Sequence, residues 1–328
     1  MTIERAVHGA YFPGDGDDWE RIAPEEAGWD ARLLDAALDQ TMREGAGAVL
    51  IVQGGRILAE CYGEGWGAEV RERCSSIQKS VIALLVGIAL QEGRLSLTDP
   101  LSRSLGARWG NVSGEAEARI TLRHLLTMTS GLDNDLNAVA EPGTVWFYNS
   151  PAYYRLKAVL EAATKLPLVA FMRDRLTGPI GAGETDWVGP LLTGQQLRVS
   201  ARDLARIGLL VLHGGRWGTR TLLADTEYRH AMLRTSQALN PAYGYLWWLN
   251  GQDSFLVSGA DEQRGGALIP AAPADLISGR GGRGQRLYIV PSLDLVVVRH
   301  GTQPAPVGRQ GVDALDDRLW RGLITAIQ

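Results

Sequence analysis

Ser76-Ile77-Gln78-Lys79-Ser80 directly precedes the longest apolar run of the chain, residues 81–90. On a helix, residues three apart lie on one face, so we expect the ammonium of Lys79 one turn above the hydroxyl of Ser76. The first N–H groups of a helix are unpaired and its dipole is positive there, which favours a negative charge developing near the serine. The stretch therefore predicts that Ser76 is a nucleophile and that Lys79 helps to deprotonate it. The alternative is an N-cap serine followed by a solvated lysine.

The composition of the 328-residue chain is that of an ordinary globular protein, with 45% hydrophobic residues, 21% charged residues and a formal net charge of -4. This balance indicates neither nucleic-acid binding nor attraction to an acidic membrane surface. Residues 81–90 make only half of a membrane span, and the first residues lack an apolar secretion segment, so we expect a cytoplasmic location. Cys61 and Cys74 are then free thiols. Five scattered histidines, none at ligand spacing, predict no metal site, and no cofactor is expected.

Hydrophobic periodicity predicts an order of strands, helices and strands again. A helix over 30–44 is followed by strands at 48–52 and 57–62, joined by a Gly-Gly turn. Further helices are predicted at 120–128, 153–164, 201–212 and 311–327, and further strands at 243–249, 287–290 and 293–298. The Gly/Ala/Pro-rich segment 254–275 is predicted to be a loop.

Strands at both chain ends with helices between them predict an α+β fold, an α/β sandwich. We expect one antiparallel sheet built from both chain ends and covered by the N- and C-terminal helices. An all-helical lobe is inserted into it. The expected domains are 1–105 with 240–328 for the sheet and 106–239 for the helical lobe, with the active site between them.

Two later segments carry further candidate chemistry. The first, Tyr148-Asn149-Ser150, follows Glu141-Pro142-Gly143-Thr144-Val145-Trp146-Phe147. The second, Ser278-Gly279-Arg280-Gly281-Gly282-Arg283-Gly284-Gln285, contains a G-x-G-x-x-G spacing. A dinucleotide site is excluded there, because a strand follows instead of a helix whose N-terminus would hold a pyrophosphate.

With the S-x-x-K of Ser76 and Lys79, these segments resemble the motifs of the serine β-lactamase-like superfamily. Within it, the sequence is most similar to class C-like esterases and 6-aminohexanoate-oligomer hydrolases, and the resemblance spans most of the chain. It implies a β-lactamase/transpeptidase-like fold. It also implies that Tyr148 shares the proton transfer, and we expect the nearby Lys79 ammonium to lower the pKa of this phenol so that it acts as a base.

The resemblance also assigns positions around the substrate. Ser150 stands at a substrate-binding position where many relatives carry Asn. Gly281 matches the last glycine of the third motif, and the N–H of Gly282 joins the N–H of Ser76 as the oxyanion hole. Trp146 is a candidate wall of the cleft. Phe147, Trp187, Trp247 and Trp248 are further candidates, with core packing as the alternative for each.

The third motif departs from the family at one position. Gly279 replaces the family lysine, which weakens the case for β-lactams or peptidoglycan peptides, since these substrates depend on that lysine for their carboxylate. Arg280 or Arg283 is a candidate to bind a substrate carboxylate as a bidentate fork, against the alternative of a solvated surface arginine.

The motifs together predict a serine hydrolase that cleaves a carboxylic ester or linear amide of a small molecule through an acyl-enzyme on Ser76. A transesterase or acyltransferase would use the same residues, and a β-lactamase or D-Ala peptidase is a further alternative. A non-catalytic binding protein is disfavoured, because Ser76, Lys79 and Tyr148 are all present. The expected partner is the small-molecule substrate, with no nucleic acid and no membrane.

Overall fold

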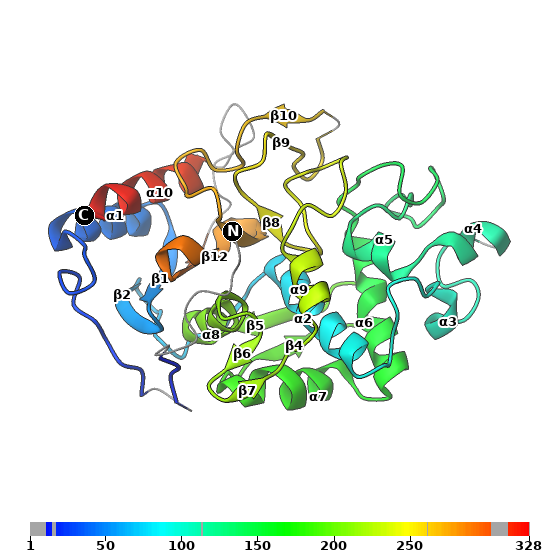
Figure 1. Ribbon diagram of the computed structural model, residues 1–328, viewed down its shortest axis with the longest axis horizontal. Helices are drawn as coiled ribbons and strands as arrows, with labels where there is room; N and C mark the ends of the chain where they lie inside the picture. Colours follow the sequence, from blue (N-terminus) through cyan, green and yellow to red (C-terminus); the bar gives the residue numbers. More distant parts are fainter. Residues whose placement is uncertain (1–10, 15–17, 113, 261, 303–313, 328) are drawn as a thin grey trace.

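The computed structural model describes residues 11–14, 18–112, 114–260, 262–302 and 314–327. Its centre is an antiparallel sheet in the order β2-β1-β13-β12-β11-β8 (Figure 1). The bounds of its strands are, in that order, Arg56–Tyr62, Ala46–Gln53, Leu295–Gly301, Gln285–Val290, Ile277–Gly281 and Trp248–Leu249. The sheet therefore joins the two chain ends, as the sequence predicted.

The centre of the sheet is apolar on both faces. Strands β1 and β13 pair over Val49 to Val52 and Leu295 to Val298, and these residues are fully buried. Such continuous β-branched runs suit strands covered on both sides. The β1–β2 hairpin turns at Gly54 and Gly55, whose positive φ values of 57° and 79° suit a two-residue turn without a Cβ penalty.

Helices cover both faces of this sheet (Figure 1). The N-terminal α1 (Ala31–Arg43) packs against the C-terminal α10 (Ala314–Ala326) on one face, and the Asp30 N–H donates to the Ala326 carbonyl at 2.8 Å. Asp30 also starts α1 as its N-cap, because its carboxylate accepts from the N–H groups of Arg32 and Leu33. On the other face lies α8 (Ala201–Leu212), where Gly208 allows contact with Val296. Of the predicted C-terminal helix, 311–313 lie outside the described residues.

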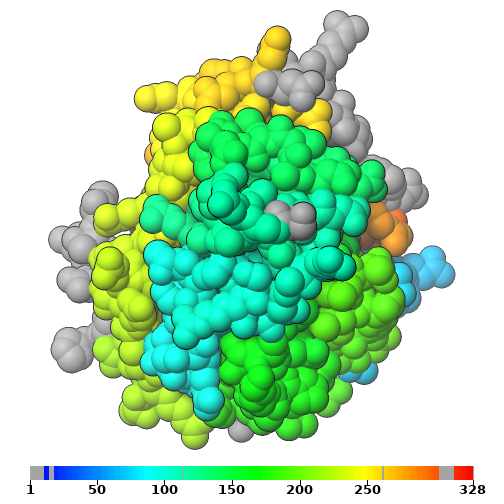
Figure 2. Space-filling view, turned by 90° about the vertical axis from the view of Figure 1, so that its right-hand side faces the viewer, coloured from blue at the N-terminus to red at the C-terminus, as the bar shows by residue number. Residues whose placement is uncertain are grey.

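The segment between the two parts of the sheet is mainly helical and forms the surface coloured cyan to green in Figure 2. It also contains short strands, namely a three-stranded sheet β3-β5-β4 and the β6–β7 hairpin. Its helices are α3 (Ser102–Leu105), α4 (Gly114–Arg119), α5 (Leu122–Leu126), α6 (Ser150–Thr164), α7 (Leu168–Met172) and α9 (Thr226–Met232). Its strands are β3 (Glu72–Arg73), β4 (Asp186–Val188), β5 (Gln196–Val199), β6 (Arg216–Trp217) and β7 (Arg220–Thr221).

Helix α2 (Ile77–Gln91) connects the sheet with this helical part, and its residues from Ile77 to Ala89 are all buried. A helix that is apolar all round belongs in a core. Within the described part of the chain, no helix is both long and apolar enough to cross a membrane.

The predicted strand over 243–249 is wrong. Only Trp248–Leu249 forms a strand, because the chain reverses at Leu246, whose φ is 60°, and the Gly244 N–H donates back to the Trp247 carbonyl at 2.9 Å. The predicted loop 254–275 is correct apart from two short strands, β9 (Ser254–Phe255) and β10 (Arg264–Gly265).

Candidate active site

Ser76 and Lys79 meet at the first turn of α2. The Lys79 Nζ lies 3.0 Å from the Ser76 Oγ, and Lys79 is only 3% exposed. Within the described structure, the Ser76 hydroxyl does not cap the helix backbone. The alternative of an N-cap serine with a solvated lysine is therefore wrong: the lysine is buried and its nitrogen faces the serine.

The residue before the serine is held in an unusual conformation. Ser75 has a φ of 50°, a region that non-glycine residues seldom occupy. Such backbone strain persists where the surroundings impose it, often at functional sites. Here the surroundings are β11: a Cβ added at Gly281 would lie 2.5 Å from the Cys74 carbonyl oxygen and 3.0 Å from the Ser75 Cβ. Strand β11 therefore packs directly against the turn that precedes Ser76.

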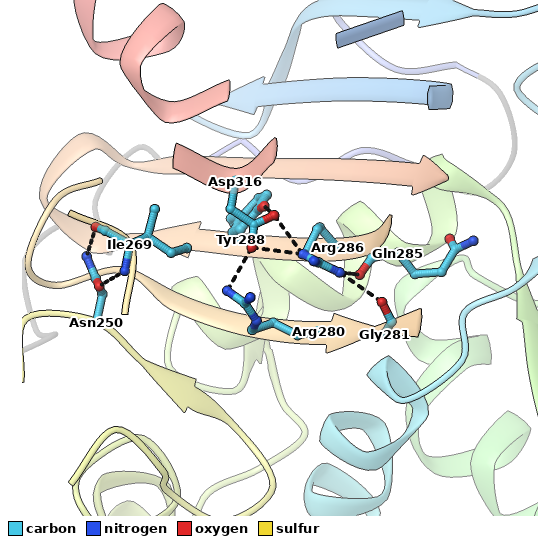
Figure 3. A network of polar contacts seen from close by, with 8 residues as sticks. All are labelled: Asn250, Ile269, Arg280, Gly281, Gln285, Arg286, Tyr288 and Asp316. Atoms are coloured by element: carbon cyan, nitrogen blue, oxygen red, sulfur yellow. Dashed lines mark hydrogen bonds and ion pairs between the residues drawn. The ribbon is translucent and has the colours of Figure 1, made fainter. Parts of the chain in front are cut away.

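The side chain of Arg286 fixes the orientation of the peptide between Gly281 and Gly282 (Figure 3). Arg286 Nη1 donates to the carbonyl oxygens of Gly281 and Gln285, both at 2.8 Å, while its Nε donates to Asp316 at 2.8 Å. In a trans peptide the carbonyl and the next N–H point in opposite directions. The Gly282 N–H therefore points away from Arg286. A Cβ on Gly282 would lie 3.9 Å from the Ser75 Oγ, so this residue lies beside the turn that precedes α2.

Tyr148 reaches the site from the loop before α6. Its ring lies under the Lys79 ammonium, with the Nζ 4.8 Å from the ring centroid, and its hydroxyl interacts with the Ser76 hydroxyl. Asn149 caps α6 by accepting from the Ala152 N–H at 2.8 Å, and its amide donates to the Leu132 carbonyl at 2.8 Å. The cap thus anchors the segment that carries Tyr148.

The electrostatics reverse one expectation. Burial lowers the pKa of Lys79 to about 7, whereas burial raises the pKa of Tyr148 to about 12 despite its contact with Ser76. The predicted lowering of the Tyr148 pKa by Lys79 is therefore wrong, because removal from water outweighs the favourable neighbours of the phenolate. Near neutral pH Lys79 can therefore be an uncharged amine that accepts a proton, and Tyr148 is a neutral phenol that can donate one.

Ser150, the first residue of α6, lies inside the site. Its Oγ is 3.2 Å from the Lys79 Nζ, so Lys79 contacts two hydroxyls, one from α2 and one from α6. Sequence reasoning placed Ser150 beside the substrate but missed its contact with Lys79. No local signal indicates that contact, because it joins residues on separate helices.

Arg280 does not stand alone in the cleft. Its side chain runs from β11 toward α10, where Nη1 lies 2.8 Å from the buried carboxylate of Asp316 (Figure 3). The same carboxylate accepts from Tyr288 and Arg286. Arg280 alternates with Gly279 and Gly281, which face α2, and its side chain is ion-paired instead of solvated at the surface. Arg283 is exposed and donates to the Thr302 carbonyl at 2.8 Å.

The predicted aromatic walls divide into two groups. Trp146 and Trp248 pack around Tyr148, with ring centroids 6.2 Å and 5.9 Å from it, and the Trp146 Nε1 is buried without a partner among the described residues. Phe147 is partly exposed. Trp187 and Trp247 are core residues, as the packing alternative proposed.

Among the described histidines, His124 has a structural role. His124 accepts from the Thr121 N–H at 3.1 Å as part of a capping box. Across the described ranges, no group of three His, Cys, Asp or Glu side chains is placed to hold a metal ion. Both cysteines of the described chain are free thiols.

The sequence of this chain is similar to those of known proteins. A family model described as Beta-lactamase matches residues 31–319. The chain belongs to the Beta-lactamase family.

Relatives in this family include named hydrolases. The 6-aminohexanoate-dimer hydrolase of Paenarthrobacter ureafaciens is 23% identical over 355 residues, covering 90% of this chain and 79% of the relative. Esterase EstB of Burkholderia gladioli is 30% identical over 240 residues, covering 56% of this chain and 60% of the relative. Among solved structures, EstCE1, described as a hydrolase with promiscuous acyltransferase activity, superposes with a TM-score of 0.64 at 17% identity, covering 88% of this chain and 98% of that one.

In this Beta-lactamase-family chain, close packing of α2 accompanies the glycine at position 279. A Cβ there would lie 3.1 Å from the Ile77 Cγ2 and 3.3 Å from the Ser80 Oγ, tighter than ordinary contact. Helix α2 thus approaches β11 too closely for a larger side chain at 279 without adjustment.

Proposed function

We propose that this protein is a serine hydrolase that cleaves carboxylic esters or linear amides of small molecules through an acyl-enzyme on Ser76. The observation that carries the proposal is the 3.0 Å contact between the Ser76 Oγ and a buried lysine nitrogen whose pKa is lowered to about 7. A nucleophile and a base within hydrogen-bond reach, with the base near the working pH, are what acyl transfer requires.

In the first half-reaction the amine of Lys79 takes the proton of the Ser76 hydroxyl as the Oγ attacks the substrate carbonyl. The N–H groups of Ser76 and Gly282 receive the developing oxyanion. The tetrahedral adduct then collapses, the bond to the leaving group breaks, and Tyr148 donates its proton to the departing alkoxide or amine. The Lys79 ammonium returns its proton to the tyrosine. Water repeats the sequence on the acyl-enzyme, giving the carboxylic acid and free Ser76.

The surroundings of Tyr148 favour an apolar substrate. Trp146, Trp248 and Tyr243 form an aromatic cluster with it, with ring-centroid distances from 4.9 to 6.3 Å. With Arg280 ion-paired to Asp316 and glycine at 279, we expect little attraction for a substrate carboxylate. This argues for neutral esters or amides over β-lactams. The names of the two relatives, an esterase and a 6-aminohexanoate-dimer hydrolase, support the same range of substrates.

An alkyl phosphonate tests the proposal directly. It should label the wild-type protein once, at Ser76, and Ser76→Ala should lose both the label and the turnover of nitrophenyl esters. A panel of short and long nitrophenyl esters, linear amides and a chromogenic cephalosporin then ranks the substrates. Labelling elsewhere, or ester turnover in Ser76→Ala, refutes the proposal, and rapid cephalosporin clearance refutes the substrate range.

Acyl transfer to an alcohol is the second candidate. The aromatic cluster beside Ser76 suits an apolar alcohol acceptor as well as a leaving group, and EstCE1 shares the fold. Product analysis with an added alcohol distinguishes the two, because an acyltransferase forms the new ester in excess over the free acid.

A further inference from the structure

Lys157 is a buried amine that the mechanism above does not use. It lies on α6, is fully buried, and its Nζ donates to the Gln78 Oε1 at 3.0 Å and to the Gln195 carbonyl at 2.8 Å. Its ammonium also lies 4.3 Å from the Trp187 ring centroid. Gln78 is the neighbour of Lys79 on α2, so a second lysine is joined to the site through one residue.

The choice of lysine at this position is unusual for this chain. Of its 33 basic residues only three are lysines, and the rest are arginines. Lys165 is exposed at the end of α6, whereas Lys79 and Lys157 are both buried. Arginine stays charged in proteins, while lysine can lose its proton. The chain therefore places amines that can be neutral at the two buried positions.

The two buried amines share one aromatic ring. The Tyr153 ring centroid lies 4.7 Å from the Lys79 Nζ and 5.5 Å from the Lys157 Nζ, so the nitrogens are at most about 10 Å apart. Burial and the charge of Lys79 together lower the pKa of Lys157 to about 7. No carboxylate of the described residues is among the groups that act on the pKa of either lysine. Two ammonium groups so placed disfavour each other.

The partners of the two amines differ in kind. Lys157 faces two carbonyl oxygens, which only accept hydrogen bonds, whereas aromatic rings lie beside both amines. Lys79 faces the hydroxyls of Ser76 and Ser150, which can donate to a neutral amine as well as accept. Because carbonyl oxygens only accept, the partners of Lys157 stabilise an ammonium and cannot donate to a neutral amine. One proton shared between the two lysines therefore resides on Lys157.

We propose that Lys157 is a positioning residue for the base: the two buried lysines hold one proton between them near neutral pH, Lys157 carries it, and its charge keeps Lys79 as the neutral amine that deprotonates Ser76. This rests on the proposed function of Ser76 and Lys79. Interacting groups of this kind titrate as a pair rather than singly.

The other titratable groups around the pair add no charge at neutral pH. Burial raises the pKa of Cys74 to about 12. Burial also raises the pKa of Tyr153 well above its usual range, and it raises the pKa of Tyr154. Tyr148, which faces Lys79, is likewise neutral, and Arg280 is the cation that acts on it. Lys79 and Lys157 are thus a pair of interacting cations, and their repulsion acts on both.

Lys157→Met and Lys157→Gln test the proposal in the full-length protein, with Lys165→Met as the control for removing an amine from α6. The readout is kcat/KM for a neutral nitrophenyl ester from pH 5 to 10. One unit charge at about 10 Å shifts the pKa of Lys79 by about one pH unit. We expect the acid limb of both Lys157 variants to move up by that amount. This lowers kcat/KM about fivefold at pH 7 and not at pH 9. Lys165→Met should keep the wild-type limb.

If the acid limb of the pH profile stays in place in folded Lys157→Met and Lys157→Gln, the inference is overturned. This holds even if activity falls at every pH, since that result indicates a structural role only. Phosphonate labelling of Ser76 in the wild-type protein separates this failure from failure of the proposed function. If neither variant folds, carbon-13 at Cε of the three lysines in the wild-type protein decides the point. The Lys79 signal is identified by its response to the phosphonate. At pH 7 Lys157 should report an ammonium and Lys79 an amine, and the reverse assignment overturns the inference.

Discussion

The packing of β11 on the turn before Ser76 makes Gly281→Ala the most informative substitution. Its new methyl would lie 2.5 Å from the Cys74 carbonyl oxygen, 3.0 Å from the Gln285 Cβ and 3.0 Å from the Ser75 Cβ. Cβ atoms essentially never approach other atoms below 3.0 Å, and the closest contact here is backbone, which cannot rotate away. The strand and the serine turn must therefore separate.

Separation of β11 from the serine turn should affect both the stability and the kcat of Gly281→Ala. Overpacking of this kind costs about 1–3 kcal/mol in the free energy of unfolding. The same movement withdraws the Gly282 N–H from the oxyanion position, and losing one such donor lowers kcat by about 10²–10³. We expect Gly281→Ala to fold, to bind substrate with little change in KM, and to lose about two orders of magnitude in kcat.

The adjacent glycine provides a matched control. A Cβ at Gly282 meets only the Ser75 Oγ, at 3.9 Å, which is ordinary contact. Gly282→Ala keeps its N–H and is expected to remain within a few-fold of the wild-type kcat. Stopped-flow acylation by a nitrophenyl ester measures the step, with thermal unfolding of both variants alongside. Wild-type acylation in Gly281→Ala, or an equal loss in both variants, refutes the reasoning.

Three further predictions concern the charged groups. Below pH 7, kcat/KM of the wild-type protein for a neutral ester should fall about tenfold per pH unit, because Lys79 gains a proton as the pH falls through its pKa of about 7; a flat pH–rate profile contradicts this. Lys79→Met should be inactive yet unfold at higher temperature. The folded-state pKa of Lys79 lies below the usual 10.5, so burial of its charge destabilises the fold fully below pH 7 and progressively less up to pH 10.5. The gain in the free energy of unfolding, about 1–4 kcal/mol at pH 6, should shrink as the pH rises. Thermal melts of both proteins at pH 6 and at a higher pH measure it. Asp316→Asn should lower the free energy of unfolding by about 3–5 kcal/mol, because it leaves Arg280 and Arg286 buried without their carboxylate; a near-wild-type melting temperature speaks against the network.

Much of the fold was predictable because local signals are strong there. The helix 201–212 and the Gly-Gly hairpin were predicted within a few residues, since apolar periodicity and turn chemistry are read from neighbouring residues. The strand predicted over 243–249 failed because its aromatic residues fit a buried turn equally well, and the left-handed conformation of Leu246 has no signature in the sequence.

By itself, the sequence determined that Ser76 and Lys79 meet, since they lie one helical turn apart and their contact needs only a helix. It also determined, through Gly281 and Gly282, that a strand could approach that helix closely. Tertiary structure alone decided which of the two groups can accept a proton near neutral pH, because the pKa values of Lys79 and Tyr148 depend on burial by distant segments. It also decided that Arg280 faces Asp316 and that Lys157 lies near Lys79. Burial and long-range contacts arise from the whole packed chain, and no short stretch of sequence encodes them.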